Sequence, residues 1–129
     1  MTARRIQYCL AAVFFVLGGW ALLAPANVIA LTFLPAFRGG AALPFAVACF
    51  GAQACIAGLF AATARFTATT FLAYALALIP FFVFDLWFTL GDPVLTPLGG
   101  WADAAGNIAM MALCLAGYRQ LGPGFAGGE

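Results

Sequence analysis

Histidine, lysine and serine are absent from this chain of 129 residues, and only 7% of its residues are charged. Their absence excludes histidine-ligated metal or haem, a lysine Schiff base and a serine nucleophile. The five basic residues are all arginines, and the formal net charge is +1 without a basic cluster. Nucleic acid is therefore not an expected partner. We also expect no cofactor.

Hydrophobic residues are what the chain has in excess, at 66% of the sequence. A typical soluble domain is roughly one quarter charged, whereas a transmembrane helix needs about 20 consecutive, mostly apolar residues. Runs of this kind cover residues 6–24, 43–63, 66–90 and 98–118. The sequence therefore predicts an all-α integral membrane protein, with one transmembrane domain over residues 1–129 and the lipid bilayer as its surroundings.

The links between the four runs favour an antiparallel four-transmembrane-helix bundle, because short connections place consecutive helices side by side. The connection over residues 25–40 is too apolar for a solvated loop. We expect it to cap the end of the bundle, or to lie in the membrane interface with Arg38 reaching the headgroups. Pro80 should kink the third helix. The glycine-rich residues 121–129 are expected to form a mobile tail.

Arginine placement predicts the orientation. Arg4, Arg5, Arg65 and Arg119 fall on one side of the predicted bundle, and Arg38 alone falls on the other. Cytoplasmic loops of membrane proteins carry the excess of basic residues. Both termini are therefore predicted to be cytoplasmic.

Two acidic residues lie within the predicted spans, Asp85 and Asp103. Ionisable side chains are rare there, and they usually face the interior of a bundle. Asp85 precedes Gly91 by six residues and Asp103 follows Pro97 by six, so each lies about 9 Å from the same turn. The two carboxyls are therefore expected at nearly the same height, in the outer half of the membrane.

Two amides extend this polar group. Asn107 lies one helical turn below Asp103 on the same face, and Gln53 lies about 14 Å along its helix from Pro44, near the level of Asn107. We take Asp85, Asp103, Asn107 and Gln53 as candidates for ligand binding or proton handling. Two neighbouring carboxyls can share a proton or hold a cationic or hydroxyl-bearing ligand.

A purely structural interpretation stands beside this one. The two acids can hold the third and fourth helices together through hydrogen bonds. Asp103 is also close to the start of the fourth helix, where a carboxylate is favoured by the helix dipole. Asp85 would be wet if its helix ended early. The sequence leaves both interpretations open.

The four cysteines, Cys9, Cys49, Cys55 and Cys114, lie within predicted helices and form no CxxC pair. Cysteine is a common small, apolar packing residue, and we expect that role here. Cys9 and Cys114 both fall near the inner ends of their helices, but their spacing does not specify a soft-metal site. The sequence therefore predicts no metal ligands and no catalytic residue.

The segment from Gly18 to Pro25 (GGWALLAP) closes the first helix, the second helix carries glycines, and the last helix holds Asp103 and Asn107. In these features the chain resembles the small four-helix bacterial membrane proteins of the DoxX-like kind. The resemblance implies a four-helix fold in the bacterial inner membrane and carries over no catalytic motif. Small multidrug exporters also have four helices, but they use a glutamate in the first helix, which this chain lacks.

Three hypotheses for function follow. We favour a non-enzymatic accessory or structural subunit of a larger membrane complex or homo-oligomer. The alternative is a small transporter or ligand-binding protein that uses an outward-facing Asp85/Asp103 cluster. A third is a membrane enzyme acting on a lipid or isoprenoid, with the acids as general acid and base and with Trp87, Trp101 and Tyr74 lining an apolar pocket.

Overall fold

Long apolar helices dominate the computed structural model, which describes residues 1–122. Four spans are long and apolar enough to cross a membrane, namely Ala3–Leu23, Ala42–Thr63, Ala68–Gly91 and Pro97–Leu121. Over residues 1–122 no β-strand forms, and extended pairing is limited to an isolated bridge between Phe33 and Leu95. The prediction of an all-helical chain with four helices of membrane-spanning length is confirmed.

The elements follow one another as α1 (Ala3–Leu23), α2 (Pro25–Thr32), η1 (Pro35–Phe37), α3 (Ala42–Thr63), α4 (Ala68–Ala77), α5 (Ile79–Leu86), η2 (Trp87–Gly91) and α6 (Pro97–Leu121). Leu121, expected to begin the tail, is instead the last residue of α6. The rest of that tail, residues 123–129, lies outside the described residues.

Threonine starts three of the helices in this serine-free chain. The side chains of Thr2, Thr67 and Thr96 each accept a hydrogen bond from the backbone N–H three residues further on, at 3.4, 3.1 and 3.0 Å. Such a bond satisfies one of the free N–H groups at a helix N-terminus. The three residues therefore fix where α1, α4 and α6 begin.

The third span is not one continuous α-helix. It breaks at Leu78, between α4 and α5. Pro80 explains the break, because its ring lacks an N–H and clashes with the carbonyl four residues earlier. The interruption lies where the sequence predicts a kink. After α5 the span ends in η2, a π-helical turn in which Asp92 N–H donates to the Trp87 carbonyl at 2.8 Å.

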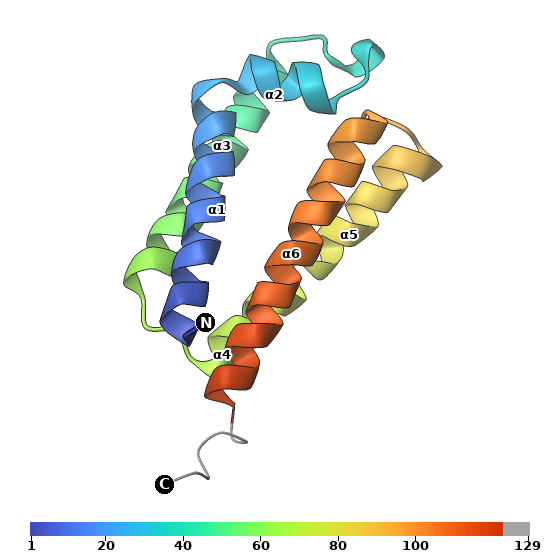
Figure 1. Cartoon of the computed structure of the whole chain (residues 1–129). Helices are drawn as coiled ribbons and strands as arrows, with labels where there is room; N and C mark the ends of the chain where they lie inside the picture. The colour runs from blue at the N-terminus through green and yellow to red at the C-terminus, as the bar shows by residue number, and fades with distance from the viewer. Residues whose placement is uncertain (123–129) are drawn as a thin grey trace, which may run out of the picture.

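The helices form two groups, α1 with α3 and α4–α5 with α6 (Figure 1). The two groups approach each other where α1 begins and α6 ends, which we call the terminal end. They diverge toward the opposite end, where α2 lies across the top of the view. We call this opposite end the capped end.

Glycine allows α1 and α3 to come unusually close. A Cβ atom on Gly51 would lie 2.6 Å from the Gly18 carbonyl oxygen, and one on Gly18 would lie 2.8 Å from the Ala54 Cβ. Neither contact is tolerable, so both positions need a residue without a side chain. Small residues at helix interfaces let backbones approach in this way in membrane proteins.

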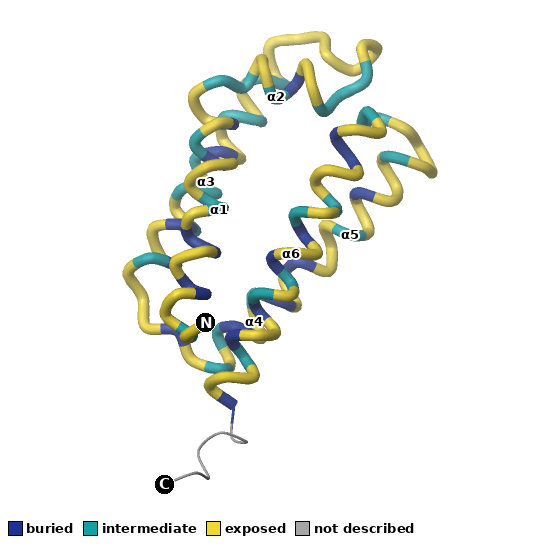
Figure 2. The backbone as a smooth tube through the Cα atoms, in the orientation of Figure 1, coloured by how far each residue is buried: buried dark blue, intermediate teal, exposed yellow. Residues whose placement is uncertain are grey.

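The shared core lies toward the terminal end (Figure 2). Its buried members are Ile6, Leu10, Ala11, Ala61, Phe66, Phe71, Ala75, Leu78, Met110 and Cys114. Most other large apolar side chains are exposed, among them Phe45, Phe60 and Leu98, at 72%, 63% and 70%. Such a surface is unlike that of a soluble domain of this size, which rarely exposes large contiguous apolar patches.

Hydrogen bonds tie the connections together at the capped end, away from the shared core. Leu34 N–H donates to the Val94 carbonyl at 2.9 Å, and Thr96 N–H donates to the Thr32 carbonyl at 2.8 Å. The Thr96 hydroxyl also donates to the Leu31 carbonyl at 2.7 Å. The apolar connection over residues 25–40 thus folds into α2 and η1, and is tied to the turn that precedes α6.

Candidate functional site

A buried hydrogen bond joins α5 to α6. Asp85 is 5% exposed and Asn107 is 7% exposed, and the Asn107 side-chain Nδ2 donates to the Asp85 Oδ2 at 3.0 Å. A carboxyl removed from water is costly unless it is hydrogen-bonded. Asn107 therefore gives Asp85 a partner that it needs at this depth.

Asp103 completes the polar group. It lies one helical turn before Asn107 on the same face of α6, and its carboxyl lies near the side chains of Asp85 and Asn107. The structure thus brings together two carboxyls and one carboxamide from α5 and α6. We refer to Asp85, Asp103 and Asn107 as the acid–amide cluster.

Unlike its two partners, Asp103 is exposed. Three other residues on the same helical face are buried, namely Gly99, Asn107 and Met110. They lie four residues before Asp103, four after it and seven after it. The shared core begins on α6 only at Met110. Asp103 thus lies on the packing face of α6, but beyond the point at which the core covers that face.

Thr89 extends the polar face of α5 toward the capped end. Its hydroxyl oxygen is buried and has no hydrogen-bond partner within residues 1–122. It packs directly against Gly100, where an added Cβ would collide with the Thr89 side chain. The absence of a side chain at Gly100 therefore allows η2 and α6 to approach closely above the acid–amide cluster.

Gln53, the fourth candidate, is not part of this group. It is exposed on α3, and α3 packs against α1 and α2. The sequence predicts how far along its helix Gln53 lies, but it does not predict which side of the helix the side chain occupies. The structure therefore separates Gln53 from the acid–amide cluster.

The three aromatic residues expected around a pocket do not gather there either. Trp87 and Trp101 are 59% and 53% exposed. Tyr74 instead packs on α4 against Phe14 and Phe66, with ring centroids 6.1 and 5.3 Å away. The apolar pocket that the enzyme hypothesis requires is therefore not assembled from these side chains.

The acid–amide cluster lines neither of two hollows described on the surface of residues 1–122. One is a shallow hollow along the side of α5 and η2, lined by Val83, Leu86, Trp87, Leu90 and Gly91. The other lies at the terminal end, between the start of α1, the α3–α4 link and the end of α6. Within the same residues no group of three histidine, cysteine or acidic side chains could hold a metal ion.

Gln7 is a buried polar residue that is not among the candidates predicted from the sequence. It is 2% exposed on α1, and its Nε2 donates to the Ala61 carbonyl at 2.6 Å and to the Ala64 carbonyl at 2.7 Å. These are carbonyls that the end of α3 leaves free. One signal was available, because Gln7 lies three residues before Leu10 and four before Ala11 on an apolar helical face.

Comparison of the chain with protein-family models, with curated proteins and with solved structures finds no match. Two adjacent carboxyls and an amide can accept hydrogen bonds, share a proton or bind a cation.

Proposed function

We propose that the chain is a small multi-pass protein of the bacterial inner membrane, built as an antiparallel bundle with both termini in the cytoplasm. Four helices of sufficient length and hydropathy support the membrane assignment. The placement of four of the five arginines toward the terminal end supports the orientation. Membership of a DoxX-like group is part of this proposal and rests on the sequence resemblance alone.

Within the membrane, we infer a non-enzymatic role as an accessory or structural subunit. The observation that carries this inference is the exposure of Asp103 on a helix of membrane-spanning length. Asp103 lies six residues into α6, about 9 Å from its start. An ionisable group at such depth is costly where no protein covers it, so a partner that covers Asp103 and hydrogen-bonds it would stabilise the assembly.

The test is native electrophoresis of the protein extracted gently from its own membranes. We expect the wild-type chain to migrate in a complex larger than one protomer. Asp103→Leu should shift it toward the protomer, because the leucine cannot bond a partner. Asp92→Asn, which changes an acid in the turn outside the helices, should leave the complex intact. Migration of the wild-type chain as a lone protomer would contradict the proposal.

A second candidate function is favoured by the proximity of Asp85 and Asp103. Two neighbouring carboxyls can form a site for a proton or a small cation, and Asn107 holds one of them in place. Trp101 lies two residues from Asp103, so tryptophan fluorescence of the reconstituted protein can report on the site. A response to pH or to added sodium that is lost in Asp85→Asn/Asp103→Asn would support this function, and a response that persists in that variant would exclude it.

A further inference from the structure

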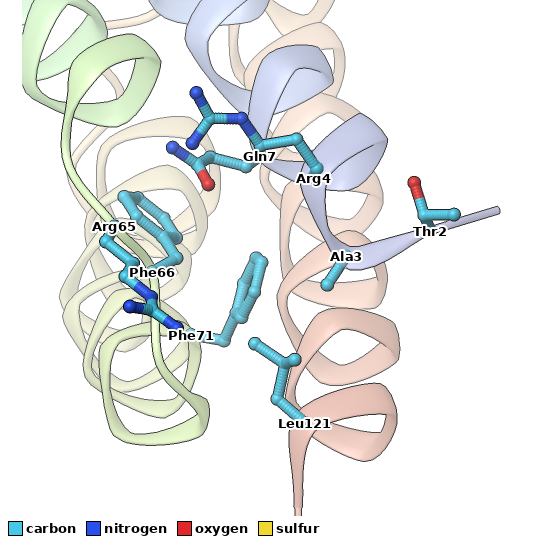
Figure 3. A pocket seen from close by; sticks show the side chains of 8 residues that line it. All are labelled: Thr2, Ala3, Arg4, Gln7, Arg65, Phe66, Phe71 and Leu121. Atoms are coloured by element: carbon cyan, nitrogen blue, oxygen red, sulfur yellow. The ribbon is translucent and has the colours of Figure 1, made fainter.

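The hollow at the terminal end combines a cationic rim with an apolar floor (Figure 3). It has a volume of about 400 Å³. Arg4 from α1 and Arg65 from the α3–α4 link lie at its edge, and Phe66, Phe71 and Leu121 provide apolar surface. The hollow lies where three segments far apart in the sequence meet.

Neither arginine of the rim has an acidic neighbour among residues 1–122. The acids in that part of the chain are Asp85, Asp92 and Asp103, which belong to α5, the turn before α6 and the first half of α6. All three lie toward the capped end, and residues 1–122 contain no salt bridge within the usual distance. The positive charge at the hollow is therefore not neutralised by this part of the chain.

Arg4 is held in place by Tyr8. The Arg4 Nε donates to the Tyr8 hydroxyl at 3.0 Å, and the guanidinium carbon lies 4.8 Å from the centroid of the Tyr8 ring. This arrangement uses one donor of the guanidinium and leaves the terminal N–H groups for an anion. An oriented guanidinium suits phosphate, because its planar fork can donate two parallel hydrogen bonds.

The floor of the hollow belongs to the core. Phe71 is fully buried and Phe66 is 9% exposed, and their rings pack edge to face with centroids 5.1 Å apart. A soluble anion gains nothing from such a surface. An amphipathic anion, whose charged group is followed immediately by an apolar portion, gains from the rim and from Leu121, which is 44% exposed, while Phe66 and Phe71 close the floor behind it.

We propose that this hollow binds an anionic phospholipid, with the headgroup phosphate on Arg4 and Arg65 and the glycerol and upper acyl region against Leu121, above the floor that Phe66 and Phe71 close. Basic pockets at the ends of transmembrane helices suit such headgroups. The inference rests on the membrane placement proposed above, because only then does the terminal end lie at the depth of the headgroups. It requires neither a protein partner nor the acid–amide cluster.

Native mass spectrometry of the purified full chain tests the site, with phosphatidylglycerol and phosphatidylcholine of equal chain length added to the detergent. We expect the wild-type chain to retain phosphatidylglycerol in preference to phosphatidylcholine. Arg4→Gln/Arg65→Gln should lower this retention by at least about tenfold, since each basic residue near the headgroups contributes a several-fold gain. The matched control, Arg5→Gln/Arg119→Gln, removes the same charge from the same end without touching the hollow, and should retain the lipid.

Four outcomes would overturn the proposal. Equal retention of the two lipids would show that charge is not recognised. Equal loss in the two double variants would show diffuse attraction rather than a site. Displacement of phosphatidylglycerol by excess inorganic phosphate would identify a site for soluble anions. A large gain in retention on truncation after Gly122 would identify residues 123–129 as the occupant. All four are read on the detergent-solubilised protein, so they are independent of the complex sought under the proposed function.

Discussion

At the scale of single residues, buried amides hydrogen-bond the acceptors that lie between the helices. Asn107 satisfies a carboxyl on a neighbouring helix, and Gln7 satisfies two free carbonyls at the end of α3. In both cases the amide donates, and the group that accepts would otherwise be buried without a partner. Removing one side of such a bond costs more than the bond itself contributes.

For the Asp85–Asn107 bond this asymmetry gives a measurable prediction. Asn107→Leu should lower the free energy of unfolding by about 1–2 kcal/mol, because the Asp85 carboxyl loses its donor. Asp85→Leu/Asn107→Leu should be less destabilised than the sum of the single variants. Equilibrium unfolding in mixed SDS micelles measures all three proteins. Strict additivity would show that the two side chains do not interact.

Gln7 offers a second prediction with a control elsewhere in the chain. Gln7→Leu should destabilise the protein by about 1–3 kcal/mol, since two carbonyls of α3 lose their donor. Gln53→Leu changes an exposed glutamine on α3 itself and should shift stability by no more than about 0.5 kcal/mol. Equal effects of the two substitutions in thermal unfolding would contradict the capping role of Gln7.

At the scale of elements, the separation between α1 and α3 is set by residues that have no side chain. Gly18 faces α3, whereas a Cβ on its neighbour Gly19 would meet no atom within 4 Å. Gly18→Leu should therefore force the helices apart and destabilise the fold by about 1–3 kcal/mol or more.

Gly19→Leu is the matched control for this prediction, because it adds the same side chain one position along the same helix. It should leave the midpoint of thermal unfolding in detergent nearly unchanged. If the two leucine variants unfold at the same temperature, the close contact of α1 with α3 is not a source of stability.

The elements also show what a sequence can and cannot predict here. The positions of the four long helices follow from hydrophobic runs, and the break after α4 follows from Pro80. Asp85 and Asp103 could be placed at one height because both distances are counted from the same turn. Gln53 could not be placed, because depth does not determine which helices are neighbours. The place of Gln7 on an apolar helical face indicates that it is buried, but its partners are backbone carbonyls, which no side-chain pattern reveals.

At the scale of the whole molecule, the two ends differ in charge. The terminal end carries Arg4, Arg5, Arg65 and Arg119, and the capped end carries Arg38 and Asp92. In a membrane this asymmetry sets the direction of insertion. It also places the arginine-lined hollow on the side where the basic residues gather.

A fusion experiment tests this orientation. A fluorescent reporter that matures only in the cytoplasm should be bright when it is joined to either terminus. Insertion of the same reporter after Asp92, in the turn before α6, should leave it dark. Brightness at the turn together with dark termini would reverse the topology, and brightness at one terminus alone would exclude an even number of crossings.

The division of the molecule into two helix groups has a consequence for its biosynthesis. The α1–α3 group and the α4–α6 group are each continuous in sequence, and each is a helical hairpin with most of its close contacts inside itself. In the membrane placement proposed above, the first hairpin can enter the bilayer and close on its glycines while the second is still being translated. Docking of the second hairpin then forms the core at the terminal end and, at the capped end, the hydrogen bonds that Thr96 donates to the carbonyls of Leu31 and Thr32. Thr96 is thus both the N-cap of the last helix and the residue whose hydroxyl hydrogen-bonds the first hairpin, at the Leu31 carbonyl.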